Sequence, residues 1–166
     1  MCRNRDELED PVRLPVLEPG FETDDVAKIL ELVPIATHNQ RGRQTLFVGT
    51  EQDLDAEVLV DIAERSMSAP IYDLLKRPDE LFVVEHAHLQ PRFVEDSVRH
   101  ALRDALDTLP QLDDDDFLLS KQVNFETIHV HDVVAERFGT VGELRGELAT
   151  GEPSPRQTTL SGWLAG

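Results

Sequence analysis

Residues 91–109, PRFVEDSVRHALRDALDTL, carry the clearest structural signal in the sequence. Pro91 suits the first turn of a helix, because its fixed φ angle is helical and its missing N–H would have no partner there. Apolar side chains then recur about every four positions, which is the period of one face of an α-helix. They are Val94, Val98, Leu102, Leu106 and Leu109. The stretch therefore predicts an amphipathic helix that packs against another element.

The sequence on either side of this helix predicts shorter elements. Helices are expected over 23–33 and over 54–67, and a short helical turn over 72–75. Strands are expected over 45–48 and 81–84, and the chain is strand-like from 117 to about 131. This order predicts an α+β fold in which an antiparallel sheet packs on two helices. Because so small a sheet has open edges, which neighbouring subunits commonly pair, we expect an oligomer.

The chain divides into one expected domain and two flanking segments. Residues 1–20 are charged and contain several prolines, and they form an N-terminal segment without a regular period. Residues 21–140 are expected to form the folded domain. Apolar content falls after Gly139, so residues 141–166 are expected to be a flexible acidic and polar tail, apart from Trp163 and Leu164.

The charge of the chain excludes several classes of partner. Asp and Glu number 33 against 16 Lys and Arg, which gives 166 residues a formal net charge of -17. A nucleic-acid-binding protein needs a basic surface, and an anionic membrane would repel this one. Only three of the basic residues are lysines. Acid-rich, lysine-poor surfaces suit concentrated salt, where screening weakens self-repulsion, so we expect either a halophilic protein or an ordinary acidic one.

The single cysteine bears on the compartment. Cys2 has no second cysteine with which to form an intrachain disulfide, which is typical of a reducing cytoplasm. No apolar run approaches the roughly 20 residues that span a bilayer, and no signal peptide opens the chain. We therefore expect a cytoplasmic protein.

Basic residues cluster in two polar segments. Arg41 and Arg43 lie in the segment Thr37-His38-Asn39-Gln40-Arg41-Gly42-Arg43, and Lys76 and Arg77 lie in Leu74-Leu75-Lys76-Arg77-Pro78-Asp79-Glu80. Each segment alone is compatible with a surface loop or a charged turn. In so acidic a chain, these local cations are also what a phosphorylated substrate would need.

Two further features could carry chemistry. His129 and His131 are two residues apart, so on a regular strand they would share a face, as metal ligands or catalytic residues can. Glu126 has the opposite parity and joins them only if the strand bends or ends there. Glu95 lies beside the apolar stripe of its helix, where it is either an ion-paired boundary residue or a buried recognition group.

These segments, in this order, resemble the second half of the type IB and MptA-type GTP cyclohydrolases. The resemblance runs from about residue 21 to about residue 138. It rests on residues 37–42 (Thr-His-Asn-Gln-Arg-Gly), 75–80 (Leu-Lys-Arg-Pro-Asp-Glu), 93–96 (Phe-Val-Glu-Asp) and 124–131 (Asn-Phe-Glu-Thr-Ile-His-Val-His). It implies the tunnelling fold (T-fold), in which antiparallel sheets from several subunits assemble into a barrel. In the domain division above, residues 21–140 would be that domain, partial relative to the family.

The resemblance also implies an activity. Members of the family hydrolyse GTP and expel C8 as formate to build a pterin for methanopterin or folate synthesis. The archaeal branch forms 7,8-dihydroneopterin 2′,3′-cyclic phosphate and diphosphate with Fe(II), and relatives accept other divalent metals, so Mn or Zn is also compatible. GTP and further copies of the chain would then be the partners, with neither nucleic acid nor membrane involved.

The family's motifs assign roles to individual residues. His38 and Glu80 match metal-site residues, and Glu95 matches the glutamate that anchors the purine. Glu126 and His129 match a Glu-Ser-Ile-His motif in which the histidine is catalytic, and His131 is a further catalytic candidate. Arg41, Arg43, Lys76 and Arg77 are candidates for the triphosphate by charge and not by family assignment.

One departure from the family pattern bears on activity. The family carries a Cys-Pro-Cys-like loop upstream of His-Asn-Gln-Arg, with one cysteine in the metal site, and no such loop is present. Met1-Cys2-Arg3 resembles sequence just after that loop, so we expect the chain to be a fragment, a mis-started product or one piece of a split protein. Two alternatives to an active enzyme follow. One is a catalytically inactive T-fold subunit that binds purine or assembles with a full-length partner, and the other is an acidic interaction module.

Overall fold

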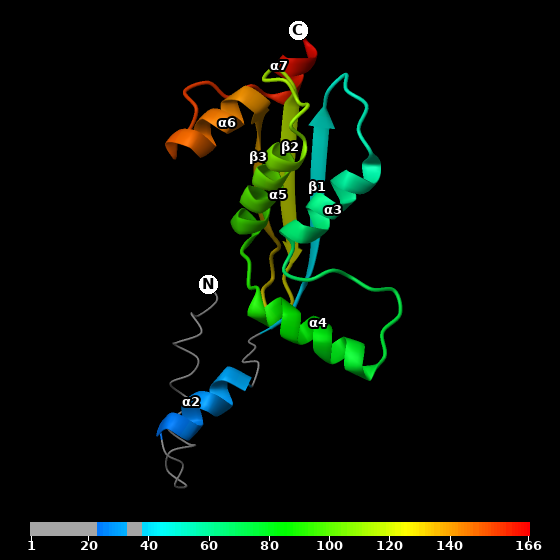
Figure 1. The fold of residues 1–166 in the computed structure, drawn as a ribbon, viewed down its shortest axis with the longest axis vertical. Coiled ribbons are helices and arrows are strands. Elements are labelled where there is room, and N and C mark those ends of the chain that lie inside the picture. Colours follow the sequence, from blue (N-terminus) through cyan, green and yellow to red (C-terminus); the bar gives the residue numbers. More distant parts are fainter. Residues whose placement is uncertain (1–22, 33–37) are drawn as a thin grey trace. The chain divides into compact units, whose positions relative to one another are not determined.

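The computed structural model describes residues 23–32 and 38–166, which fall into two compact units (Figure 1). The described residues of the first unit, 23–32, 38–39 and 74–90, contain α2 (Thr23–Leu32) and α4 (Arg77–Leu89). The second unit, residues 40–73 and 91–166, contains the sheet and the remaining helices. In chain order these are β1 (Arg41–Gly49), α3 (Ala56–Ser66), α5 (Val94–Thr108), β2 (Phe117–Phe125), β3 (Val133–Thr140), α6 (Val141–Thr150) and α7 (Leu160–Leu164).

The sheet has three strands in the order β1-β2-β3, and both pairs are antiparallel. Arg41 lies opposite Phe125 and Gly49 opposite Phe117, so β1 and β2 pair along their whole length. On the other side of β2, Phe117 lies opposite Thr140. Since side chains alternate between the two faces of a strand, this register puts Leu118 on one face and Phe117 on the other. The expected α+β architecture with an antiparallel sheet is confirmed.

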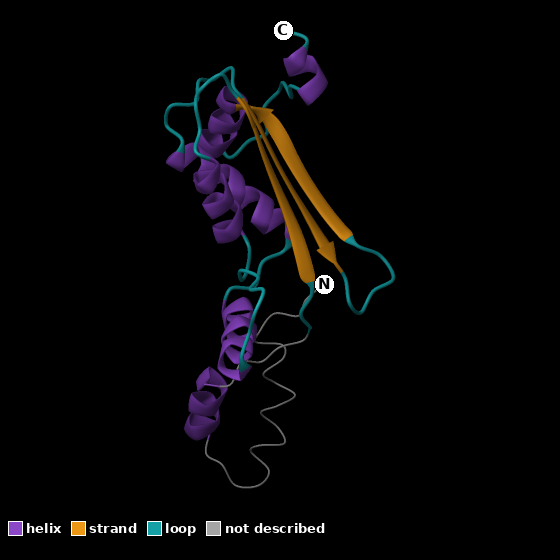
Figure 2. Ribbon diagram, turned by 90° about the vertical axis from the view of Figure 1, so that its right-hand side faces the viewer, coloured by secondary structure: helices purple, strands orange, loops and turns teal. Residues whose placement is uncertain are grey.

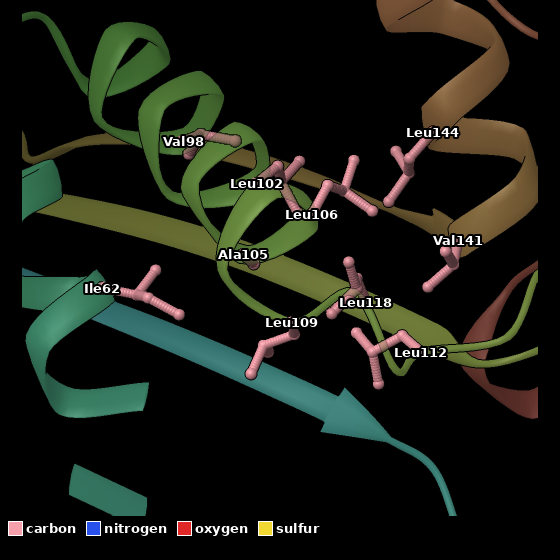
Figure 3. Packing of buried hydrophobic residues seen from close by; sticks show 10 residues of the cluster. All are labelled: Ile62, Val98, Leu102, Ala105, Leu106, Leu109, Leu112, Leu118, Val141 and Leu144. Atoms are coloured by element: carbon pink, nitrogen blue, oxygen red, sulfur yellow. The ribbon is translucent and has the colours of Figure 1, made fainter. Parts of the chain in front are cut away.

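Helices α3, α5 and α6 pack on one face of the sheet (Figure 2). The apolar stripe of α5 lies over Leu118 of the central strand, flanked by Ile62 of α3 and Leu144 of α6 (Figure 3). Burying one such aliphatic side chain contributes about 1.5–3 kcal/mol, so this layer is the main source of stability in the second unit. The buried cluster is Ile62, Val98, Leu102, Ala105, Leu106, Leu109, Leu112, Leu118, Val141 and Leu144.

The opposite face of the sheet is covered only near one end among the described residues. There α7 lays Trp163 against Phe117, with ring centroids 5.7 Å apart. Gly49 lies under the same indole, and a Cβ at that position would come within 2.6 Å of the ring. The indole Nε1–H also donates to the carbonyl of Asp115 at 2.7 Å. Further along this face, apolar side chains such as Phe47 and Val134 remain exposed.

The C-terminal residues differ from the tail expected over 141–166. Residues 141–150 form α6, which begins with a capping box between Thr140 and Glu143 and supplies Val141 and Leu144 to the core. The following segment is attached through Glu143, whose carboxylate accepts from the N–H and the hydroxyl of Thr158 at 3.0 and 2.7 Å. Few apolar residues mark this region in the sequence, so its order rests on capping and on carboxylate hydrogen bonds.

Three other local predictions need correction. Residues 81–84 lie inside α4 and do not form a strand, because the helix starts upstream, where the Asp79 carboxylate accepts from the Lys76 N–H at 2.9 Å. A short apolar run such as Leu-Phe-Val-Val fits either structure. Residues 72–75 form no helical turn, and β2 ends at Phe125, short of residue 131.

The other predicted elements are confirmed. The helix expected over 23–33 is α2 as far as Leu32, since residue 33 lies outside the described residues, and the helix expected over 54–67 is α3. The helix expected over 91–109 is α5, but it begins at Val94, where the Asp96 carboxylate accepts from the Phe93 N–H, so Pro91 is not in its first turn. The strand expected over 45–48 lies within the longer β1. In the part of the chain that the structure describes, no helix combines the length and the apolar character needed to cross a bilayer.

Candidate functional site

A hydrogen bond joins two of the motifs singled out from the sequence. Gln40 lies just before β1 and Glu126 just after β2, at the same end of the sheet. The side-chain amide of Gln40 donates to Glu126 Oε1 at 2.7 Å across 86 residues of sequence. Arg41 begins β1 beside this bond, and its side chain is exposed. Antiparallel pairing of β1 with β2 is what brings Gln40 and Arg41 beside the start of the Glu-Thr-Ile-His segment.

The Glu-Thr-Ile-His segment belongs to the loop that connects β2 to β3. His129 and His131 are both exposed, and their rings stack with centroids 5.5 Å apart and an interplanar angle of 18°. The prediction that the two histidines share the face of a strand is therefore wrong, since neither lies in a strand. The loop nevertheless places the two imidazoles side by side in a position open to solvent.

Glu95 lies in the first turn of α5 and borders a groove of about 650 Å³. The groove runs between α5, β3, α6 and residues 151–157, and Val98 and Leu102 contribute apolar lining. The side chain of Glu95 is exposed, and it forms no ion pair among the described residues. Neither of the two environments expected for Glu95, an ion pair or burial, is therefore present.

Arginines that were not among the predicted site residues also line this groove. Arg99 and Arg103 follow Glu95 at intervals of four along α5, and Arg137 reaches the groove from β3. The i, i+4, i+8 spacing puts the three α5 side chains on one face of the helix, so the signal was present in the sequence. The Glu147 carboxylate of α6 binds the Arg137 guanidinium in a two-pronged contact.

The two carboxylates of α6 have lowered pKa values. Burial alone would raise the pKa of Glu147, but hydrogen bonds from Arg137 and from the Ser154 N–H, together with the charge of Arg137, outweigh burial and lower it. Burial likewise opposes ionisation of Glu143, and hydrogen bonds from Thr158 and the Thr140 N–H lower its pKa. Both carboxylates thus stay ionised. Glu147, which lines the groove, binds the Ser154 N–H, and Glu143, which does not line it, binds Thr158, so the two attach the C-terminal segment to α6.

The remaining candidates belong to the first unit. Lys76 caps α4, Arg77 is the first residue of this helix, and Glu80 lies in its first turn. All three side chains are exposed, whereas His38, in the same unit, is half-buried. Two basic side chains and a carboxylate are thereby concentrated at the beginning of α4.

The described residues do not by themselves make up a metal centre. Within them, no three His, Cys, Asp or Glu side chains gather closely enough to hold an ion. A catalytic divalent metal usually has three protein ligands and one open position. His38 and Glu80, the residues expected to bind metal, would therefore be an incomplete set.

The fold is a helix-backed antiparallel sheet, with histidines and carboxylates at one end of its strands. Comparison with known sequences then places it in a family. The profile of the type I GTP cyclohydrolase folE2 family matches residues 21–135, and the chain belongs to that family.

The similarity extends to individual proteins. GTP cyclohydrolase MptA of Methanococcus maripaludis is 43% identical over 145 residues, which cover 86% of this chain and 46% of that protein. MptA of Methanosarcina mazei is 43% identical over 144 residues, covering 86% and 45%. MptA of Methanocaldococcus jannaschii is 45% identical over 137 residues, covering 81% and 44%. The chain thus spans about half the length of the relatives that it matches.

Proposed function

We propose that this chain carries the substrate-handling half of a GTP cyclohydrolase of pterin biosynthesis. The reaction opens the purine of GTP, releases C8 as formate and yields 7,8-dihydroneopterin 2′,3′-cyclic phosphate and diphosphate. The observation that carries the proposal is the family match over residues 21–135, because this span contains every candidate residue from His38 to His131. Relatives that are 43–46% identical bear the name GTP cyclohydrolase MptA.

Each proposed role follows from the chemistry of the side chain. The exposed carboxylate of Glu95 offers two acceptor oxygens, which can take both N1–H and N2–H of guanine and so distinguish it from adenine. The stacked imidazoles of His129 and His131 are side chains of the kind that act as general acid and base, and we assign them proton transfer as the ring opens. Glu126 lies at the start of the same loop, and we assign it a part in that transfer. Arg41, Lys76 and Arg77 supply positive charge for the triphosphate.

A divalent metal, Fe(II) or else Mn or Zn, belongs to this proposal as an expectation. His38 and Glu80 would contribute to its binding, and further ligands would have to come from outside the described residues. When bound, such a metal would lower the pKa of a water molecule and supply hydroxide.

We also propose that the sheet is completed by other subunits into a T-fold barrel. Within the described residues β1 and β3 each have one unpaired edge, and much of one sheet face is uncovered. Exposed edges of this kind favour pairing with another strand. The single cysteine agrees with a cytoplasmic location for this assembly.

A second candidate function is a catalytically inactive subunit that binds GTP without turnover. The observation that favours it is the incomplete ligand set, since no trio of metal-binding side chains is present among the described residues. An inactive subunit would keep the groove and Glu95 but would not need a complete metal centre.

One experiment separates the two. The purified chain is incubated anaerobically with Fe(II) and GTP, and formate and a fluorescent oxidised pterin are measured, with GTP binding followed by calorimetry. Product formation that His129→Asn abolishes supports the enzyme, and the exposed His100→Asn on α5 is the matched control. Binding that Glu95→Gln abolishes, without product from the wild type, supports the inactive subunit. If the chain neither binds GTP nor forms product, both candidate functions are contradicted.

A further inference from the structure

The bond between Gln40 and Glu126 continues the pairing of β1 with β2 by one position. Arg41 lies opposite Phe125, so Gln40 and Glu126 are the next pair outward, beyond the last residues of both strands. The amide Nε2 lies 2.7 Å from Glu126 Oε1, and the contact is partly buried. The other amide atom, Gln40 Oε1, is buried without a hydrogen-bond partner among the described residues. Of the two polar atoms of this side chain, only the nitrogen that contacts Glu126 is bonded.

We propose that Gln40 is a positioning residue, whose amide fixes the side-chain orientation of Glu126 at the start of the β2–β3 loop. The inference rests on the proposed function in one respect, since it is for that reaction that the orientation of Glu126 would matter. The contact itself is independent of that function and can be tested without substrate.

An amide suits this task because it orients a carboxylate without neutralising it. The structure pairs no Lys or Arg with Glu126 within the described residues, whereas Glu147 is held by the Arg137 guanidinium and Glu136 by Lys121. A neutral donor occupies one oxygen of the Glu126 carboxylate and leaves the second as an acceptor. The negative charge of Glu126 therefore stays available for a proton or a substrate N–H.

Gln44, four residues further along and inside β1, provides a matched control. Its Nε2 donates to Ser120 Oγ, also at 2.7 Å and also partly buried. Its Oε1, like that of Gln40, is buried without a hydrogen-bond partner among the described residues. The acceptor of Gln44 is a serine hydroxyl that belongs to none of the motifs. Loss of a glutamine amide at or beside β1 can thus be separated from loss of the contact with Glu126.

The experiment compares Gln40→Met and Gln44→Met in the full chain. Methionine keeps the length of the side chain and removes the donor. The side-chain rotamer of Glu126 is read from its three-bond scalar couplings by NMR, together with the cross-relaxation between the Gln40 amide protons and the Glu126 methylene. Thermal melts confirm that each variant folds. If Gln40→Met does not fold, Gln40→Leu, which also lacks a donor, replaces it.

We expect one rotamer of Glu126 in the wild type and in Gln44→Met, and rotamer-averaged couplings in Gln40→Met. In the pterin assay, kcat should fall about 10- to 100-fold in Gln40→Met, the scale of a misplaced group, with KM for GTP unchanged. Unchanged couplings in Gln40→Met, or equal averaging in Gln44→Met, would overturn the inference. A wild-type chain that makes no pterin refutes the proposed function, while the couplings still decide the role of Gln40.

Discussion

Replacing Glu147 by Gln tests how the C-terminal segment is attached to the sheet. Glu147 accepts from Arg137 Nε at 3.2 Å and from the Ser154 N–H at 2.7 Å, and it also binds Arg137 Nη2. Glutamine keeps the size of the side chain and one acceptor but removes the charge. The Arg137 guanidinium is then left partly buried, with 27% of its side chain exposed and its carboxylate partner gone.

The size of the effect follows from this burial. Exposed ion pairs contribute about 0.2–1 kcal/mol, and breaking a fully buried pair costs about 3–5 kcal/mol. Glu147 is 18% exposed, which lies between these limits. We therefore expect Glu147→Gln to lower the free energy of unfolding by about 1–2 kcal/mol at pH 7.

The contribution of Glu147 to the free energy of unfolding depends on pH in a direction that its pKa decides. The pKa of Glu147 is lowered in the folded state from its ordinary value of 4.5. Its contribution to stability is therefore fully present above about pH 4.5 and is lost as the pH falls through the lower, folded-state pKa. The stability difference between wild type and Glu147→Gln should shrink over the same window.

Urea denaturation followed by Trp163 fluorescence measures the effect, because this sole tryptophan lies in the C-terminal segment and packs on Phe117 of the sheet. The control is Glu152→Gln, an exposed carboxylate in the adjacent loop whose side chain makes no ion pair among the described residues. If Glu147→Gln destabilises no more than Glu152→Gln, or if the difference grows toward low pH, the reasoning is refuted.

Other predictions concern the hydrophobic core, the packing of Trp163 on Gly49, and the dependence of stability on salt. Leu102→Ala removes a side chain that is 6% exposed in the α5 stripe and should cost about 2–5 kcal/mol in urea denaturation, far more than Leu148→Ala at a half-exposed position of α6. Gly49→Ala puts a methyl group 2.6 Å from the Trp163 ring, so it should displace the indole, cost about 1–3 kcal/mol and change the fluorescence maximum. If the net charge of -17 reflects adaptation to salt, the melting temperature should rise steadily in molar KCl, and equal stability at low salt would refute that hypothesis.

The sequence predicted the elements that a strong period or a cap defines, and it failed where long-range contacts decide. The stripe of α5 was sufficient to predict that helix, and Leu118 packs under it as an α+β fold requires. Residues 81–84 were misassigned because four consecutive apolar residues carry no period. The helix α6 has a local signal, the Thr140-x-x-Glu143 capping box, which the low apolar content of the region obscures. The attachment of residues 154 and 158 to it depends on contacts that no local pattern encodes.

For the candidate site, the sequence identified the residues but not their contacts. The His-Asn-Gln-Arg and Glu-Thr-Ile-His motifs are recognisable as strings, but the bond from Gln40 to Glu126 depends on the register of β1 with β2. That register is set over nine residue pairs, most of them outside the motifs. The stacking of His129 on His131 likewise arises in a loop, where strand parity gives no guidance.

On the helix-facing side of the sheet, the side chains of β2 change from apolar to polar along the strand, and this change leads to a final prediction. The side chains on that face run from Leu118 in the core to Ser120, Gln122 and Asn124 toward the end where the motifs lie. Gln122 is 1% exposed, and its Oε1 has no hydrogen-bond partner among the described residues, although its Nε2 donates to Asn124 at 2.7 Å. Burying an unsatisfied acceptor costs about 1–3 kcal/mol, comparable to what one hydrogen bond returns.

Gln122→Leu should therefore leave the free energy of unfolding within about 1 kcal/mol of the wild type, or raise it, because it removes the orphaned acceptor while filling similar volume. Urea denaturation measures this, with Leu118→Gln, four residues away on the same face, as the opposite exchange and a large expected loss. A loss above about 2 kcal/mol in Gln122→Leu would show that the polar row stabilises the fold. A neutral result would mean that stability does not account for the amide of Gln122 in a buried row of the sheet.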